Sequence, residues 1–250
     1  MDKKLFEKIT KKKEFSNLPK EDVEKAFEIF EKRQVSEEEK IRITRDLLRR
    51  VFSAFTSKKL LSLKDKDSEW ILKKHISTKE RLPHYKELYS KLVSEGDTVF
   101  DLGAGINGFS YNFFPKNVYY IGIEAMGQLV DLMNYYFKTR GLEAMSVQES
   151  LFSLEKIKKY LNQVKGNKVV FLFKTLDSLE MLERNYSKKL LKEIVPLVDN
   201  VVVSFATRSL IKKTKFKAKR TWLLNFIKEN FNILDDFELG TERYIVFQKK

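Results

Sequence analysis

The 250-residue sequence contains no cysteine and only two histidines, His75 and His84. The absence of cysteine excludes disulfide bonds and thiolate metal ligands, and two histidines are too few for a histidine-rich metal site. This composition is typical of proteins in a reducing compartment. We therefore expect a cytoplasmic protein without a bound metal.

Long apolar segments are also absent. No apolar run approaches the roughly 20 residues that span a bilayer, and the first residues, MDKKLFEKITKKKEF, lack the apolar core of a signal peptide. A membrane-surface protein is disfavoured as well, because the basic segments lack an amphipathic face rich in Trp and Leu. We expect no membrane partner.

Negative charge is scarce relative to positive charge. The chain has 35 acidic residues against 49 Lys and Arg, which gives a net charge of +14 and a pI of about 9.6. Such a balance favours a polyanionic partner, and nucleic acid first. From Thr207 to Trp222 there are seven Lys or Arg residues and no acid. That segment is either a solvated basic loop or a contact surface for RNA beside an active site.

The first part of the chain contains no glycine, and the first glycine in the sequence is Gly96. Residues 17–33 and 36–55 carry apolar side chains at helical spacing, and Ser36 before three glutamates is a good helix cap. No convincing strand precedes residue 75. The sequence therefore predicts a basic helical domain over residues 1–75, followed by a second domain over 76–250.

Short apolar and β-branched runs characterise the second domain. They occur at 97–105, 117–124, 167–174 and 200–207, with helical patterns such as 127–141 and 186–198 between them. This alternation predicts a mostly parallel sheet with helices on both faces. Residues 231–250 form two strand-like runs around a Gly-Thr turn. An antiparallel C-terminal hairpin at one edge of the sheet follows from that pattern.

A nucleotide-binding pattern begins at Asp101, in the string DLGAGINGF with Gly103, Gly105 and Gly108. Glycines after a first strand allow the backbone to turn tightly and approach a ligand. Glu124 ends the next strand, at the place where an acid accepts hydrogen bonds from ribose hydroxyls. The opening acid favours a methionine-derived cofactor over a dinucleotide, and no Lys, Tyr or His pattern supports hydride chemistry.

Two further strand ends carry candidate residues. Gln148 and Glu149 follow an expected third strand and could reach an adenine edge, although polar residues after a strand are ordinary. Phe173 and Lys174 end the fourth strand, where bound ligands in such sheets meet their reaction partners. Taken alone, Lys174 is more often a solvated surface lysine than a reactive one.

Three strings together resemble one family: HISTKERLPHYKELY (75–89), FKTLDSLE (173–180) and VVVSFATRSL (201–210). They are similar to segments of the S-adenosylmethionine-dependent 16S ribosomal RNA (guanine-N7) methyltransferases, which are best known for aminoglycoside resistance. The resemblance runs from about residue 70 to the C-terminus. It implies a Rossmann-like class I methyltransferase sheet with S-adenosyl-L-methionine as cofactor. It also implies that the N-terminal helices dock on the ribosome.

The resemblance also implies roles for individual residues. Arg81 would pair with the methionine carboxylate. Without the resemblance, the sequence predicts that Arg81 forms a surface ion pair. It also predicts that Ser77 or Thr78 caps a helix. Arg208 and Ser209 would contact a flipped base, next to Lys174 at the methyl-transfer site. The implied cofactor-binding residues are His75, Ser77, Arg81, Gly103, Ala104, Gly105, Glu124, Gln148, Glu149 and Phe173.

The family pattern is not matched everywhere. Gly108 replaces a usual proline, and IKKTKFKAKR (211–220) replaces a glycine-rich stretch on the RNA side. We expect a monomer that methylates a guanine N7 of 16S rRNA in the small ribosomal subunit. Two alternatives stay open, namely a methyltransferase for another rRNA or tRNA position and a non-catalytic RNA-binding, ribosome-associated protein. A housekeeping modification and a resistance modification are equally compatible with the sequence.

Overall fold

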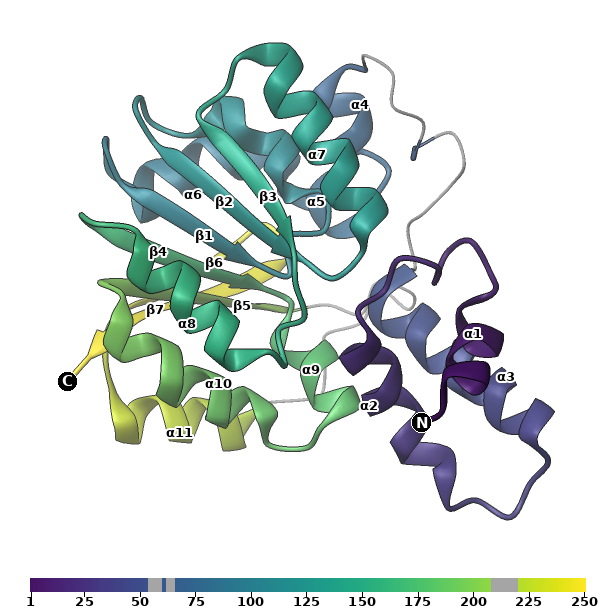
Figure 1. The fold of residues 1–250 in the computed structure, drawn as a ribbon. Coiled ribbons are helices and arrows are strands. Elements are labelled where there is room, and N and C mark those ends of the chain that lie inside the picture. The colour runs from purple at the N-terminus through teal and green to yellow at the C-terminus, as the bar shows by residue number, and fades with distance from the viewer. Residues whose placement is uncertain (54–59, 62–65, 208–219) are drawn as a thin grey trace.

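The structure is a computed structural model that describes residues 1–53, 60–61, 66–207 and 220–250 (Figure 1). The predicted contacts at Arg208 and Ser209 and residues 212–219 of the basic run over 212–220 lie outside the described residues. Arg220, the last residue of that run, is described and pairs with Asp177 at 2.6 Å.

A seven-stranded sheet forms the centre of the molecule, with the strand order β3-β2-β1-β4-β5-β7-β6. The first five of these strands in that order are parallel, and β7 is antiparallel to both of its neighbours. This arrangement confirms the predicted mostly parallel sheet with a C-terminal antiparallel hairpin. The strands are β1 Thr98–Leu102, β2 Tyr119–Glu124, β3 Ala144–Gln148, β4 Lys168–Phe173, β5 Asn200–Ala206, β6 Phe231–Leu239 and β7 Glu242–Lys249.

Helices cover both faces of the sheet, which is why the central strands are buried along nearly their whole length. All residues of β1 are buried, as are Val169 to Phe173 of β4. In Figure 1, α8, α10 and α11 gather on one side of the sheet, and α4 to α7 lie on the other. Their bounds are α4 Ser68–Leu72, α5 Ile76–Arg81, α6 Tyr85–Leu92, α7 Gly127–Arg140, α8 Leu154–Gln163, α9 Leu176–Leu182, α10 Tyr186–Ile194 and α11 Thr221–Asn230; the short 3₁₀ helices are η2 Leu82–His84, η3 Asn107–Phe113 and η4 Val195–Leu197.

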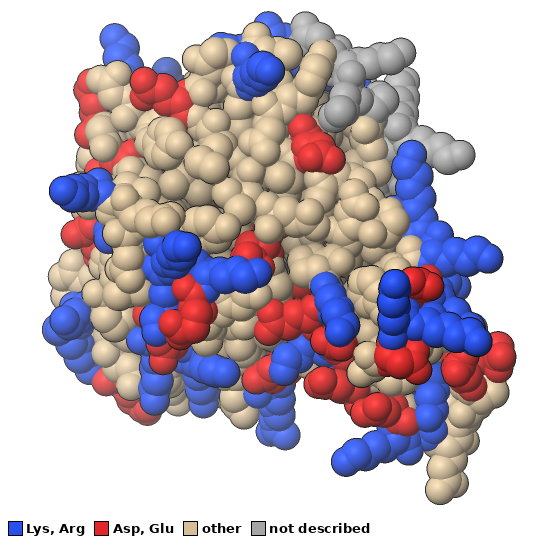
Figure 2. Space-filling model, in the orientation of Figure 1, with Lys and Arg blue, Asp and Glu red and all other residues tan. Residues whose placement is uncertain are grey.

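The N-terminal part is helical, as the sequence predicts. It contains α1 Lys3–Thr10, α2 Lys20–Glu31 and α3 Glu37–Leu48, followed by a short π-helix, η1 Arg49–Ser53. The hydroxyl of Ser36 accepts a hydrogen bond from the Glu39 amide at 3.2 Å and so caps α3. Lys and Arg project from these helices together with acids, whereas the surface over β3 and α7 is mostly uncharged in the same view (Figure 2).

Specific contacts hold the N-terminal helices against the sheet domain. Lys25 of α2 pairs with Glu183 at 2.7 Å, and both side chains are partly exposed. The backbone carbonyl of Asn17 accepts hydrogen bonds from the Gly127 amide and from the Gln148 side chain. These contacts place α2 beside the carboxyl ends of β2 and β3, where a cofactor site is expected.

Candidate active site

A cavity of about 490 Å³ opens at the carboxyl ends of β1, β2 and β4. This volume is within the range of small-molecule sites. Its walls come from both parts of the chain, with Asp22 and residues 50–52 from the N-terminal helices and the strand-end loops from the sheet domain. Among the sequence-predicted residues, the lining includes His75, Ser77, Arg81, Gly103, Ala104, Gly105, Glu124, Phe173 and Lys174.

The loop after β1 depends on glycine at two positions. Gly103 has a φ of 77°, and a Cβ atom there would lie 2.8 Å from Cγ2 of Thr175. Gly105 has a φ of 55°, in the left-handed region that favours glycine. The amides of Gly103 and Ala104 both donate to the carbonyl of Ile123, at 2.8 and 3.2 Å. These hydrogen bonds hold the loop against the end of β2, where it lines the cavity.

Glu124 is held at the end of β2 by backbone amides. Its Oε2 accepts from the Gly105 amide at 2.8 Å, and its Oε1 accepts from the Met126 amide at 2.9 Å. Burial raises the pKa of this carboxyl, and the two amides oppose the change. Each carboxylate oxygen can accept more than one hydrogen bond, so Glu124 can still receive ligand hydroxyls.

Arg81 forms a buried ion pair rather than a surface one. Its side chain is 5% exposed, and its Nε lies 2.7 Å from Oε2 of Glu242, on β7. Nη1 donates to Oδ1 of Asn107 at 3.0 Å, and the guanidinium lies 4.9 Å from the ring centre of Phe173. Burial alone would raise the pKa of Glu242, but the charges of Arg81 and Lys174 outweigh it and lower the pKa.

Lys174 is partly buried beside the same ion pair, so it is not a solvated surface lysine. Its Nζ lies 3.4 Å from Glu80 and 3.6 Å from Glu242. The residue has a φ of 57°, an uncommon backbone conformation for residues other than glycine. Its amide donates to Oγ of Ser204 at 3.1 Å. Burial lowers the pKa of Lys174, and Glu242 opposes that effect.

The segment before Arg81 differs from the expected helix start. The residue before α5 is His75, so neither Ser77 nor Thr78 is the cap. Thr78 instead donates its hydroxyl to the carbonyl of Leu72 at 2.5 Å. Burial, followed by the charges of Arg81 and Lys174, lowers the pKa of His75 to about 3. His75 is therefore a neutral group in the cavity wall at physiological pH.

Gln148 and Glu149 lie beside the cavity but are not part of its lining. The Gln148 amide donates to the carbonyls of Asn17 and Ala125. The Glu149 carboxylate pairs with Lys156 at 3.0 Å and accepts from the Ser150 amide. In this structure both side chains are engaged by other parts of the chain, and their adenine role stays a prediction.

Two acids that sequence reasoning missed contribute to the site. Glu242 accepts from Ser204 at 2.8 Å and from Tyr244 at 3.2 Å, in addition to Arg81. It lies 161 residues from Arg81, and no local pattern marks it. Asp22 does carry a signal, because it shares the spacing of the buried helix positions Ala26 and Phe30. It is 2% exposed, and its Oδ2 has no hydrogen-bond partner in the described structure.

The strand order, the glycine loop after β1 and the acid at the end of β2 define a Rossmann-like class I methyltransferase. A family model described as ribosomal RNA methyltransferase (FmrO) matches residues 33–245. The chain belongs to this family.

Relatives and solved structures agree with that membership. A 16S rRNA (guanine(1405)-N(7))-methyltransferase of Micromonospora echinospora is 26% identical over 184 residues, which cover 70% of this chain and 63% of the relative. The chain thus spans somewhat less than two thirds of that relative's length. The structure is similar to 16S rRNA methyltransferase RmtF in complex with S-adenosyl-L-homocysteine, with a TM-score of 0.81 at 19% identity and complete coverage of both chains. The 16S rRNA methylase RmtB matches with a TM-score of 0.78, also at 19% identity, over 99% of this chain and 98% of the other. At this identity the likeness is one of fold.

In the part of the chain that the structure describes, no helix is long and apolar enough to cross a membrane.

Proposed function

We propose that the protein is an S-adenosyl-L-methionine-dependent methyltransferase that modifies a guanine N7 of 16S rRNA in the small ribosomal subunit. The observation that carries this proposal is the match of the rRNA methyltransferase family model over residues 33–245, together with a cavity at the strand ends. We further propose that the protein acts as a cytoplasmic monomer, with residues 1–75 as the ribosome-docking part and residues 76–250 as the methyltransferase domain.

The residues of the cavity suit the cofactor. Glu124 offers a buried carboxylate for ribose hydroxyls, and the loop from Gly103 to Gly105 lines the cavity with open space beside Gly105 for the methionine part. The guanidinium of Arg81, fixed by Glu242, would hold the methionine carboxylate. Asp22 adds a buried oxygen without a partner, which a ligand donor would satisfy. When bound, the cofactor supplies an electrophilic methyl group on a sulfonium.

The chemistry places modest demands on the protein. Guanine N7 carries a lone pair at neutral pH, so no side chain has to remove a proton before attack. The chain must mainly align the base with the cofactor and exclude water. Phe173 and Lys174 border the end of the cavity next to β5, and Arg208 and Ser209 follow β5 in sequence. We assign these residues to the methyl-transfer end of the site.

A direct assay tests the proposal. Purified small ribosomal subunits are incubated with the protein and isotope-labelled cofactor, and the modified nucleotide is mapped by chemical cleavage at N7-methylguanine. Label at one guanine of 16S rRNA is the expected result. Label at another rRNA position or in tRNA would redirect the substrate assignment, and cofactor binding without label in any RNA would support a non-catalytic RNA-binding protein.

A further inference from the structure

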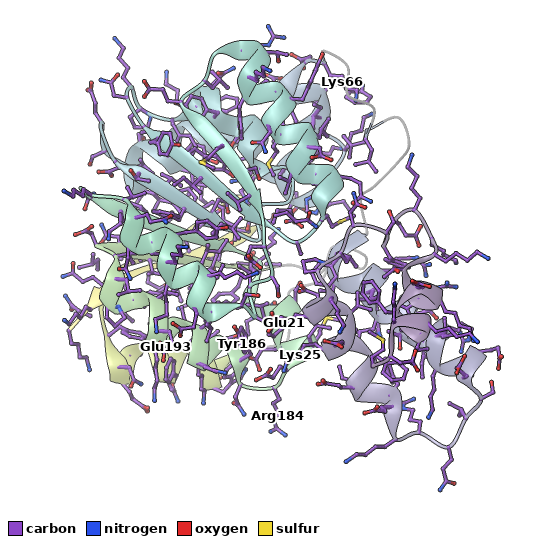
Figure 3. All side chains as sticks on the ribbon, viewed as in Figure 1. Glu21, Lys25, Lys66, Arg184, Tyr186 and Glu193 are labelled. Carbon is purple, nitrogen blue, oxygen red and sulfur yellow. The ribbon has the colours of Figure 1, made fainter. Side chains whose placement is uncertain are left out.

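Two consecutive acids of helix α2 in the N-terminal part, Glu21 and Asp22, have different surroundings. Glu21 accepts a hydrogen bond from Oγ of Ser153 at 2.6 Å, and Lys25 pairs with Glu183. Figure 3 shows Glu21 and Lys25 beside Tyr186, at the contact between α2 and the sheet domain. Asp22 belongs to the wall of the cavity instead. One turn of α2 therefore both docks the helix and contributes to the cofactor site.

The Asp22 carboxylate is buried and incompletely hydrogen-bonded. The side chain is 2% exposed, and Oδ2 has no hydrogen-bond partner among the described residues. Burial raises the pKa of Asp22 to about 7, with Ser150 opposing and the charges of Glu21 and Glu124 adding to the effect. A buried acceptor without a donor is costly to the folded protein. A ligand that supplies the donor would remove that cost.

The position of Asp22 indicates which half of the cofactor it meets. Its carboxylate is close enough to Ser150, two residues after β3, and to Glu124, at the end of β2, for both to affect its pKa. The buried ion pair of Arg81 and Glu242 belongs to the other end, near β5 and β7. In doubly wound sheets the acid at the end of β2 binds ribose hydroxyls. Asp22 is therefore on the nucleoside side, where the available donors are ribose hydroxyls and the exocyclic amine of adenine.

We propose that Asp22 is a further cofactor-binding residue whose Oδ2 accepts a hydrogen bond from the adenosine half of the cofactor, either from a ribose hydroxyl or from the exocyclic amine. This inference rests on the proposed function. It makes α2 a part of the cofactor site, so that the N-terminal helices contribute to cofactor affinity as well as to RNA docking.

Calorimetric titration of the full chain with S-adenosyl-L-homocysteine tests the proposal. Asp22→Ala should weaken binding at least about tenfold, as expected for a lost hydrogen bond to a charged group. Asp22→Asn keeps the volume and one acceptor, so an intermediate loss is expected. Glu31→Gln is the matched control, because it changes an exposed acid of the same helix outside the cavity. Its affinity should equal that of the wild type.

The melting temperature of the ligand-free protein separates binding from a structural role. Removing a buried acceptor without a partner should leave the ligand-free Asp22 variants at least as stable as the wild type. Wild-type affinity in both Asp22 variants would overturn the proposal. A fall in melting temperature that parallels the loss of affinity would also overturn it, because that pattern belongs to a structural residue.

Analogues identify the donor. The 2′-deoxy, 3′-deoxy and 6-deamino forms of S-adenosyl-L-homocysteine each lack one hydrogen-bond donor of the adenosine half. One of them should bind the wild type more weakly than the parent compound, while the Asp22→Ala variant should not distinguish it from the parent. Equal losses for every analogue in both proteins would refute the contact. Failure of the wild type to bind S-adenosyl-L-homocysteine at all would instead refute the proposed function.

Discussion

At the level of the residue, the buried pair of Arg81 and Glu242 should affect both the stability of the protein and the proposed cofactor binding. Arg81→Ala leaves the 1%-exposed carboxylate of Glu242 without its guanidinium partner. Breaking a buried pair in this way costs about 3–5 kcal/mol of stability. We expect a loss in that range, measured by urea denaturation, and weaker binding of S-adenosyl-L-homocysteine in calorimetry.

A double variant separates the two roles of Arg81. Arg81→Met combined with Glu242→Gln removes both charges, so most of the stability should return while cofactor affinity stays low. Lys8→Ala breaks the exposed pair with Glu37 and serves as a control with little expected effect. If the double variant bound the cofactor as well as the wild type, Arg81 would be a structural residue only.

Asp22 should make the stability of the ligand-free protein depend on pH. Its pKa is 3.8 in the unfolded chain and about 7 in the folded protein, because burial opposes ionisation. Between these values the folded state binds more protons, so the free energy of unfolding falls as pH rises from about 4 to 7. The shift corresponds to on the order of 4 kcal/mol.

Denaturation of the wild type and of Asp22→Asn across this pH range measures the effect. The variant cannot titrate at this position, so its stability relative to the wild type should increase from pH 4 to pH 7. Glu31→Gln, which changes an exposed acid at the end of α2, should run parallel to the wild type. A constant difference between Asp22→Asn and the wild type over the whole range would contradict the assignment.

The loop after β1 makes a prediction at the level of the element. Gly103→Ala would combine backbone strain at φ 77° with a Cβ atom 2.8 Å from Thr175. We expect a loss of about 2–4 kcal/mol from strain and overpacking together, accompanied by weaker cofactor binding as the loop moves. Thermal denaturation and calorimetry measure the two effects.

Gly166→Ala is the matched control for the loop. Gly166 also has a positive φ, 91°, but a Cβ atom there would meet nothing within 4 Å. Its loss should be limited to the strain of about 1–3 kcal/mol, with cofactor affinity unchanged. Equal effects of the two substitutions on cofactor affinity would contradict the assignment of the loop after β1 to the cofactor site.

The elements that the sequence predicts well are those with a local signal. The central strands are mostly apolar because helices cover both faces, and the glycine loop is predicted directly by its local sequence. Contacts between distant segments carry no such signal. The Gln148 side chain donates a hydrogen bond to the carbonyl of Asn17, 131 residues away. Glu242 lies next to Arg81 because β7 pairs with β5. The expected cap at Ser77 or Thr78 was wrong because Thr78 bonds back to Leu72.

The charge of the whole molecule predicts a salt dependence for the proposed binding of RNA. With a net charge of +14, affinity for 16S rRNA should fall steeply as salt concentration rises, because each neutralised phosphate releases counterions. Cofactor binding depends on a buried cavity and should change little over the same range. Filter binding of a 16S rRNA fragment and calorimetry of S-adenosyl-L-homocysteine, both from 50 to about 200 mM salt, compare the two.

Reversal of three charges locates the RNA contact. Changing Lys212, Lys213 and Lys215 to Glu should weaken RNA binding and reduce the salt slope by about 2–3, while cofactor affinity is retained. Lys116, Lys165 and Lys249 give a matched control, because they are exposed and lie at the amino ends of the parallel strands, opposite the cavity. Reversing those three changes the net charge equally, so equal losses would mean that total charge, rather than the basic segment after β5, determines RNA affinity.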